Sequence, residues 1–139
     1  MLHLIKLAVG VDEPEQIAPL QLRRKTAQGT VYHRTRMFPT RAAEICPGGS
    51  LYWVVRGLIQ VRQPIVAFHR KTDDSGKSFC LIELALTYVP VQATARRPFQ
   101  GWRYLKADDA PPDGRSAKAY VDPAMPAEMK RELRKLGLL

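Results

Sequence analysis

The stretch SLYWVVRG (50–57) constrains the fold most, because its composition is that of a β-strand. Aromatic and β-branched residues fill it, and these residue types favour the pleated surface of a sheet. Strand alternation places Trp53 on one face and Tyr52 and Arg56 on the other. We therefore expect Trp53 to lie in the core and Tyr52 to be the more exposed ring.

Two further apolar runs follow and predict a hairpin. The run LIQVRQPIVAFHR (58–70) changes its alternation at Pro64, which lacks an amide donor, so we expect a bulge or a break into two strands there. The segment TDDSGK (72–77) has the composition of a hairpin turn and leads into the strand SFCLIELAL (78–86). Glu83 is the single charge in this strand and is expected to pair with an arginine.

The order of the remaining elements predicts the fold class. We expect strands over residues 2–9, 31–38 and 89–93, a helix from the N-cap Asp12 to about Thr26, a short helix from Thr40 to Cys46, and a loop over 107–118. Apolar residues at helical spacing near the C-terminus predict a helix over 123–139, packed on a single domain of residues 1–122. The whole is expected to be an α+β fold, built as a small, curved, mostly antiparallel β-barrel with two helices in its N-terminal half and the C-terminal helix.

Composition excludes several classes of protein. The apolar runs are too short to cross a membrane, and the start MLHLIKLAVG makes a poor signal peptide, so we expect a cytoplasmic protein without a membrane partner. Cys46 and Cys80 are separated by 33 residues and show no zinc-ligand spacing with histidine or with each other. We expect no metal and no cofactor.

The charge distribution favours a polyanion as the partner. The net charge is +9, and between residues 16 and 72 the chain holds ten Lys or Arg residues against the single acid Glu44. Such segregation of charge is the usual footprint of nucleic-acid binding. The alternative is a codon-usage bias, because the chain contains 14 Arg against 8 Lys and no Asn.

Residues 96–105, RRPFQGWRYL, interleave three arginines with three aromatic rings. Arginines and rings together are typical of surfaces that stack bases and hold phosphates. Because the segment follows the last barrel strand, it is also suited to close the open end of the barrel. We expect Phe99 to anchor it, so that the segment serves both as plug and as rim of a binding surface.

The candidate site residues follow from these patterns, and none of them is assigned a catalytic role. Tyr32 shares a face with Arg34 and Arg36, which is either a binding surface or a pair of solvent-exposed strand arginines. The candidates for phosphate contacts are Arg34, Arg36, Arg41, Arg56, Arg62, Arg96, Arg97 and Arg103, and those for base stacking are Tyr52, Trp102 and Tyr104.

Three segments together resemble a known family. HLIKLAVGV, GGSLYWVVRG and RRPFQGWRYL followed by DDAPP are similar to the bacterial domain of unknown function family 1489, over nearly the whole chain. This resemblance implies no activity and no catalytic residues. A weaker, architectural resemblance to PUA-type barrels, including the ASCH and EVE groups, implies a cleft for RNA or a modified base, bordered by residues 36–41.

The function that these expectations favour is an RNA- or nucleic-acid-binding module without catalysis of its own. One alternative is a protein-interaction or assembly module, in which the basic face meets an acidic protein or the C-terminal helix joins a partner. The other is a small enzyme acting on a nucleotide or modified base, for which Glu44 and His33 are the first candidates.

Overall fold

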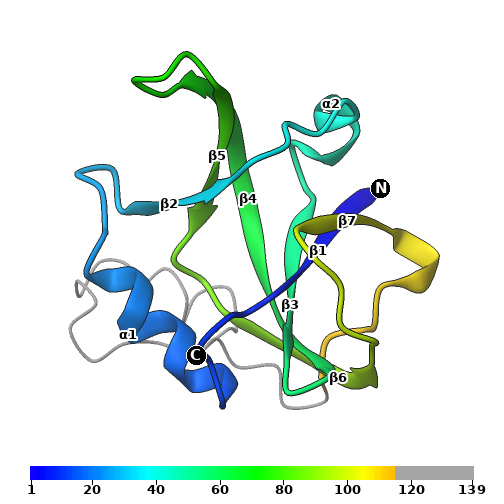
Figure 1. Cartoon of the computed structure of the whole chain (residues 1–139). Helices are drawn as coiled ribbons and strands as arrows, with labels where there is room; N and C mark the ends of the chain where they lie inside the picture. The colour runs from blue at the N-terminus through cyan, green and yellow to red at the C-terminus, as the bar shows by residue number, and fades with distance from the viewer. Residues whose placement is uncertain (115–139) are drawn as a thin grey trace.

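The stretch 50–57 forms strand β3 (Ser50–Val55), as its composition predicts, and all residues of this strand are buried. The computed structural model describes residues 1–114 of the chain (Figure 1). The other strands are β1 (Leu2–Leu7), β2 (Thr30–Thr35), β4 (Leu58–Thr72), β5 (Ser78–Ala85), β6 (Val89–Ala95) and β7 (Trp102–Lys106). The helices are α1 (Ile17–Leu22) and α2 (Ala42–Ile45), and 3₁₀ turns lie at η1 (Pro14–Gln16) and η2 (Ala107–Asp109).

The seven strands form one mixed sheet in the order β2-β5-β4-β3-β1-β7, with β6 also paired to β4. Only β1 and β3 run parallel among the strand pairs of the described residues, so the expectation of a mostly antiparallel sheet is confirmed. The expected closure into a β-barrel is wrong, because β2 and β7 end the path without pairing to each other. The fold is therefore mostly β, with an open, curved sheet.

The length of β4 explains the branching of the sheet. β4 runs unbroken through Pro64, and its register with β5 shifts just after it, between Ile65 and Ala67. Of the two expected alternatives, the bulge is therefore confirmed and the break into two strands is wrong. On the edge opposite β3, the first half of β4 pairs with β6 and the second half with β5. β6 therefore pairs with the part of the β4 edge that β5 does not reach. Because it is paired there, it is not available to close the sheet.

Both faces of the central strands are covered. Trp53 of β3 lies in the larger core, with α1 and the inward residues of β2 and β5, which confirms its expected place. Tyr52 lies in a smaller core on the opposite face, together with Val91 of β6 and Leu105 of β7. Because apolar area is removed from water on both sides, β3 has no exposed face.

The helices are shorter than the sequence predicts. The expected helix from Asp12 to about Thr26 consists of η1 followed by α1, which contains Pro19 and ends at Leu22. Asp12 is not the N-cap; its backbone N–H instead donates to Oε1 of Gln16 at 2.7 Å. Within residues 1–114, no helix is long and apolar enough to cross a membrane. The predicted C-terminal helix over 123–139 lies outside the described residues.

Candidate nucleic-acid interface

The side of β2, β5 and β4 that points away from the core carries rings and cations. Arg34 pairs across the sheet with Leu81, and Lys71 pairs with Phe79, so each pair projects to the same side. Cys80, which lies between Phe79 and Leu81 on β5, points to the other side and is fully buried. We call this side the outer β2–β5–β4 face, and its members are Tyr32, Arg34, His69, Lys71, Phe79, Leu81 and Glu83.

Two ring contacts fix the side chains on this face. The guanidinium carbon of Arg34 lies 3.8 Å from the centre of the Phe79 ring, which is a close cation–π contact. Tyr32 packs with its ring at 88° to that of His69, at a centroid distance of 5.4 Å. Tyr32 remains 37% exposed, so its ring is accessible to solvent beside the stacked arginine.

A hollow of about 550 Å³ lies where this face meets the β4–β5 hairpin. Arg34, Arg36 and Lys77 line it together with Phe79, and Asp73 is the one carboxylate in its wall. Oδ1 of Asp73 accepts hydrogen bonds from the hydroxyl and the backbone N–H of Ser75 and from the backbone N–H of Lys77. The Ser75 hydroxyl, followed by the Lys77 amide, lowers the pKa of Asp73, and the charge of Arg34 adds to this effect. Within residues 1–114, the cations of the hollow form no ion pair with a carboxylate.

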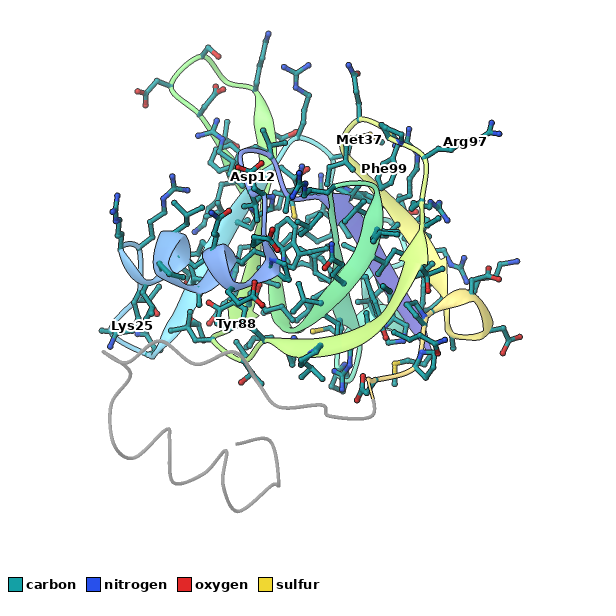
Figure 2. All side chains as sticks on the ribbon, turned by 90° about the horizontal axis from the view of Figure 1, so that it is seen from below. Asp12, Lys25, Met37, Tyr88, Arg97 and Phe99 are labelled. Atoms are coloured by element: carbon teal, nitrogen blue, oxygen red, sulfur yellow. The ribbon has the colours of Figure 1, made fainter. Side chains whose placement is uncertain are left out.

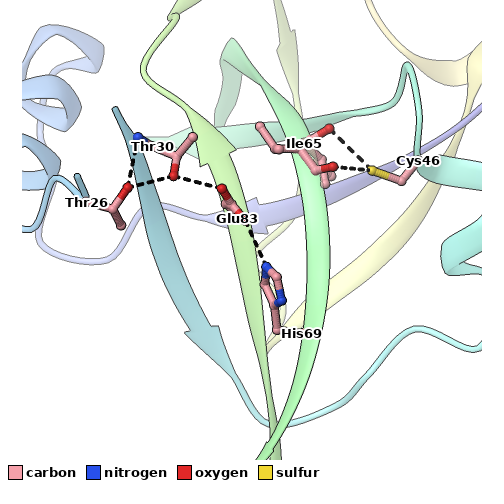
Figure 3. A network of polar contacts seen from close by, with 7 residues as sticks. Thr26, Thr30, Cys46, Ile65, His69 and Glu83 are labelled. Carbon is pink, nitrogen blue, oxygen red and sulfur yellow. Dashed lines mark hydrogen bonds and ion pairs between the residues drawn. The ribbon is translucent and has the colours of Figure 1, made fainter. Parts of the chain in front are cut away.

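The other acid of the outer face is also held by protein partners (Figure 3). Glu83 contacts Nε2 of His69 at 2.8 Å and accepts from the hydroxyl of Thr30 at 2.9 Å, and Thr30 in turn contacts Thr26. The His69 contact is the largest cause that lowers the pKa of Glu83. The expected pairing of Glu83 with an arginine is therefore wrong, because within the described residues its partner is His69 of the neighbouring strand β4.

Three of the predicted arginines form ion pairs with carboxylates elsewhere. Arg62 is the most firmly held, because its guanidinium also donates to the hydroxyl of Ser50 at 3.1 Å. The Asp113 carboxylate raises the pKa of Arg62, and the pair is partly shielded from solvent. The three pairs are Arg41–Glu44 at 2.6 Å, Arg56–Glu13 at 3.4 Å and Arg62–Asp113 at 2.7 Å.

Tyr52 does not present a ring to solvent, so its expected exposure is wrong. It is 5% exposed and packs with its ring edge against His3, at a centroid distance of 5.1 Å. Alternation places Tyr52 and Arg56 on one face only if the strand stays regular, but Arg56 lies beyond the end of β3 with a φ of 52°. The side covered by β6 and β7 thus holds Tyr52, and burial raises the pKa of its hydroxyl.

Trp102 and Tyr104 of β7 hold the segment before α2. The indole N–H of Trp102 donates to the carbonyl of Met37 at 2.9 Å, and the hydroxyl of Tyr104 accepts from the backbone N–H of Arg41 at 3.2 Å. The two rings meet edge to face at 4.9 Å, and both are half-buried. Residues 36–41 therefore lie beside β7, and the rings of Trp102 and Tyr104 mainly hold this segment in position.

Phe99 anchors its segment as expected, because it packs against the smaller core. The guanidinium carbons of Arg96 and Arg103 lie 5.6 Å and 5.5 Å from the centre of its ring. Figure 2 shows Arg97 extending away from the body of the protein near Phe99. The segment covers the smaller core and exposes three arginines at its surface.

The thiols carry no sign of a reactive site. Cys46 and Cys80 are free, and Sγ of Cys46 donates to the carbonyls of Ile65 and Val66 at 3.5 Å and 3.0 Å (Figure 3). Burial raises the pKa of Cys80 to about 11, which keeps its thiol protonated at neutral pH. No three potential ligands among His, Cys, Asp and Glu side chains converge anywhere in residues 1–114 to hold a metal ion.

Of the predicted phosphate contacts, the hollow brings together Arg34 and Arg36. Lys71, Lys77 and Phe79 belong to the same surface, although the sequence patterns do not single them out. The feature that identifies these residues is the register of β4 and β5 across the hairpin, which places residues from both strands beside β2.

The fold and this surface define a mostly β protein with an exposed sheet face that is basic and carries rings. Residues 4–139 match the family described as protein of unknown function DUF1489, and the chain belongs to this family. No curated protein and no solved structure matches the chain. The comparisons give no support to the resemblance to PUA-type domains, and the open sheet departs from the barrel which that resemblance implies.

Proposed function

We propose that the outer β2–β5–β4 face binds single-stranded nucleic acid, with RNA as the favoured form and without catalysis by the protein itself. The observation that carries this proposal is the stack of Arg34 on Phe79 at 3.8 Å, next to the exposed ring of Tyr32. Unpaired bases stack on aromatic rings and on guanidinium planes, and exposed sheet faces are a common platform for such stacking.

The charges around these rings suit a phosphate backbone. Arg36, Lys71 and Lys77 are exposed and, within the described part of the chain, form no ion pair. Glu83 and Asp73 are held by hydrogen bonds from the protein, as described above. The free cations therefore attract the phosphate backbone electrostatically. The rings of the outer face stack on bases, which is a contact that the phosphate backbone cannot make.

Variants of the two kinds of contact test this proposal. We expect Tyr32→Ala and Arg34→Ala each to weaken binding of a labelled single-stranded RNA of about 12 nucleotides roughly ten-fold, because each removes one stacking partner worth about 1–3 kcal/mol. The measurement is fluorescence anisotropy at low salt, and an equal-length DNA distinguishes the two nucleic acids. Lys106→Ala removes an exposed cation from β7 and is the matched control, expected to stay within about two-fold of the original protein.

Two results would overturn the proposal. One is an RNA affinity that is equal in all four proteins. The other is a loss in Arg34→Ala without a loss in Tyr32→Ala, together with full competition by poly-L-glutamate, since an acidic polypeptide needs the cations but not the ring.

A further inference from the structure

A second cavity, of about 460 Å³, lies between α1, the turn after β1 and the inner side of the sheet. Figure 1 shows α1 at the end of the sheet away from the tip of the β4–β5 hairpin. The cavity and the hollow described above lie on opposite sides of β2, where His33 lines the cavity and Arg34 lines the hollow. The two share no lining residue. Its volume lies within the range of small-molecule sites.

The cavity has charged groups where a sheet core is normally apolar. Lys6 pairs with Trp53 across β1 and β3 and follows Leu2 and Leu4, which are buried on the same face, so Lys6 projects into the interior side. His33 projects to the interior side of β2 in the same way, two residues after the buried Val31. The curvature of the sheet thus brings a lysine from β1 and a histidine from β2 to one cavity.

Positive charges gather in this cavity. Arg23 and Arg24, which follow α1, line it with Lys6, and no Asp or Glu among residues 1–114 belongs to its wall. Burial lowers the pKa of Lys6. Burial, and then the charges of Lys6 and Arg24, lower the pKa of His33 to about 4. Burial removes hydration from Lys6 and His33, and the exposed Arg23 and Arg24 add like charge beside them, so this arrangement is unfavourable without an anion.

His33, which lines this cavity, has one polar atom without a partner. Within residues 1–114, its Nε2 is the one buried side-chain nitrogen or oxygen without a hydrogen-bond partner. Its ring lies edge to face with Trp53, at a centroid distance of 5.2 Å and an angle of 88°. A buried polar atom without a partner is rare in folded proteins and calls for an explanation.

The rest of the wall is apolar. Ile17 and Leu20 of α1 line it opposite Trp53, and Leu20 is 47% exposed at this position. An apolar wall with a few convergent polar groups is the usual make-up of a small-molecule site.

From these contacts we propose that the cavity binds a small organic anion. Its phosphate or carboxylate lies between Lys6 and Arg24, within reach of His33, and its apolar body lies against Ile17, Leu20 and Trp53. This site is independent of the proposed nucleic-acid face, so either proposal can fail without the other.

Histidine NMR of the full chain with defined probes tests this site. The protein has three histidines, so the imidazole signals of His33 can be assigned with one His33→Gln variant. The probes are phenyl phosphate and phenylacetate, and benzyl alcohol is the neutral counterpart. We expect at least one anion to shift the His33 signals and to raise its pKa from about 4, because a bound anion offsets the charges of Lys6 and Arg24. Binding of only one of them identifies the anionic group as a phosphate or as a carboxylate.

Charge variants complete the test. We expect Lys6→Gln and the surface variant Arg24→Gln each to weaken anion binding by about ten-fold, whereas Lys71→Gln, on the outer β2–β5–β4 face, leaves it unchanged. The proposal is overturned if neither anion shifts His33 at about 10 mM, if benzyl alcohol binds as well as the anions, or if both charge variants bind as the original protein does.

Discussion

Gln63→Leu is expected to lower the free energy of unfolding by about 4 kcal/mol, because it removes the centre of a buried hydrogen-bond network. Gln63 is fully buried; it accepts from the indole N–H of Trp53 at 3.1 Å and donates to the carbonyl of Ala85 at 2.8 Å. It also exchanges hydrogen bonds with the amide of Gln21, which accepts from the hydroxyl of Tyr88 at 2.7 Å. Leucine fills a similar volume but leaves these partners unsatisfied, and each costs about 1–3 kcal/mol.

Chemical denaturation of both proteins measures this loss. Gln92→Leu is the control, because Gln92 is exposed on β6, and we expect it to change the free energy of unfolding by less than about 0.5 kcal/mol. A loss below about 1 kcal/mol in Gln63→Leu would show that the network does not hold α1 to the sheet.

Gly49→Ala is expected to lower the free energy of unfolding by about 3 kcal/mol or more, because no space exists for a Cβ atom. A Cβ there would lie 2.5 Å from the carbonyl oxygen of Ile45 and 2.6 Å from that of Leu2. Neither backbone can yield easily, since Gly49 also accepts from the N–H of Ile65 at 3.0 Å and links α2 to β4. Thermal unfolding curves of the variant and of the original protein measure this loss of stability.

Gly114→Ala is the matched control for this prediction. A Cβ at Gly114 has its nearest contact at 3.7 Å, which is ordinary van der Waals distance. We expect it to alter stability by less than about 0.5 kcal/mol. Equal stability of the two variants would contradict the close approach of β1 and α2 at Gly49.

Six of the seven strands in residues 1–114 could be predicted from the sequence, but β7, which lies in the segment expected to follow the last strand, and the open edges of the sheet could not. The composition of 50–57 and the turn at 72–77 identify β3 and the β4–β5 hairpin correctly. The branching at β4 depends on which strand edge β6 pairs with. This pairing joins residues far apart in the chain, and local sequence patterns do not determine it. Local alternation therefore gives strands and their inner residues, whereas the order of strands decides between a barrel and an open sheet.

The candidate site shows the same limit at single residues. Arg34 and Arg36 follow from charge and alternation, and they lie on the proposed surface. The prediction that Tyr52 is an exposed ring is wrong, because a second core covers its face of the sheet. Alternation alone cannot reveal this cover. Phe79 could not be predicted as a site residue, because its role depends on its contact with Arg34. Arg34 is 45 positions earlier in the chain and reaches Phe79 only through the β2–β5 register.

The salt dependence of RNA binding by the unaltered protein tests the central claim most directly. The proposal assigns phosphate contacts to four cations on and beside the outer β2–β5–β4 face, Arg34, Arg36, Lys71 and Lys77, so the affinity for single-stranded RNA is expected to fall by about 50-fold between 50 and 200 mM salt. Fluorescence anisotropy over this range gives the slope. No binding at the lowest salt, or an affinity that does not change with salt, would contradict a nucleic-acid-binding role for this face.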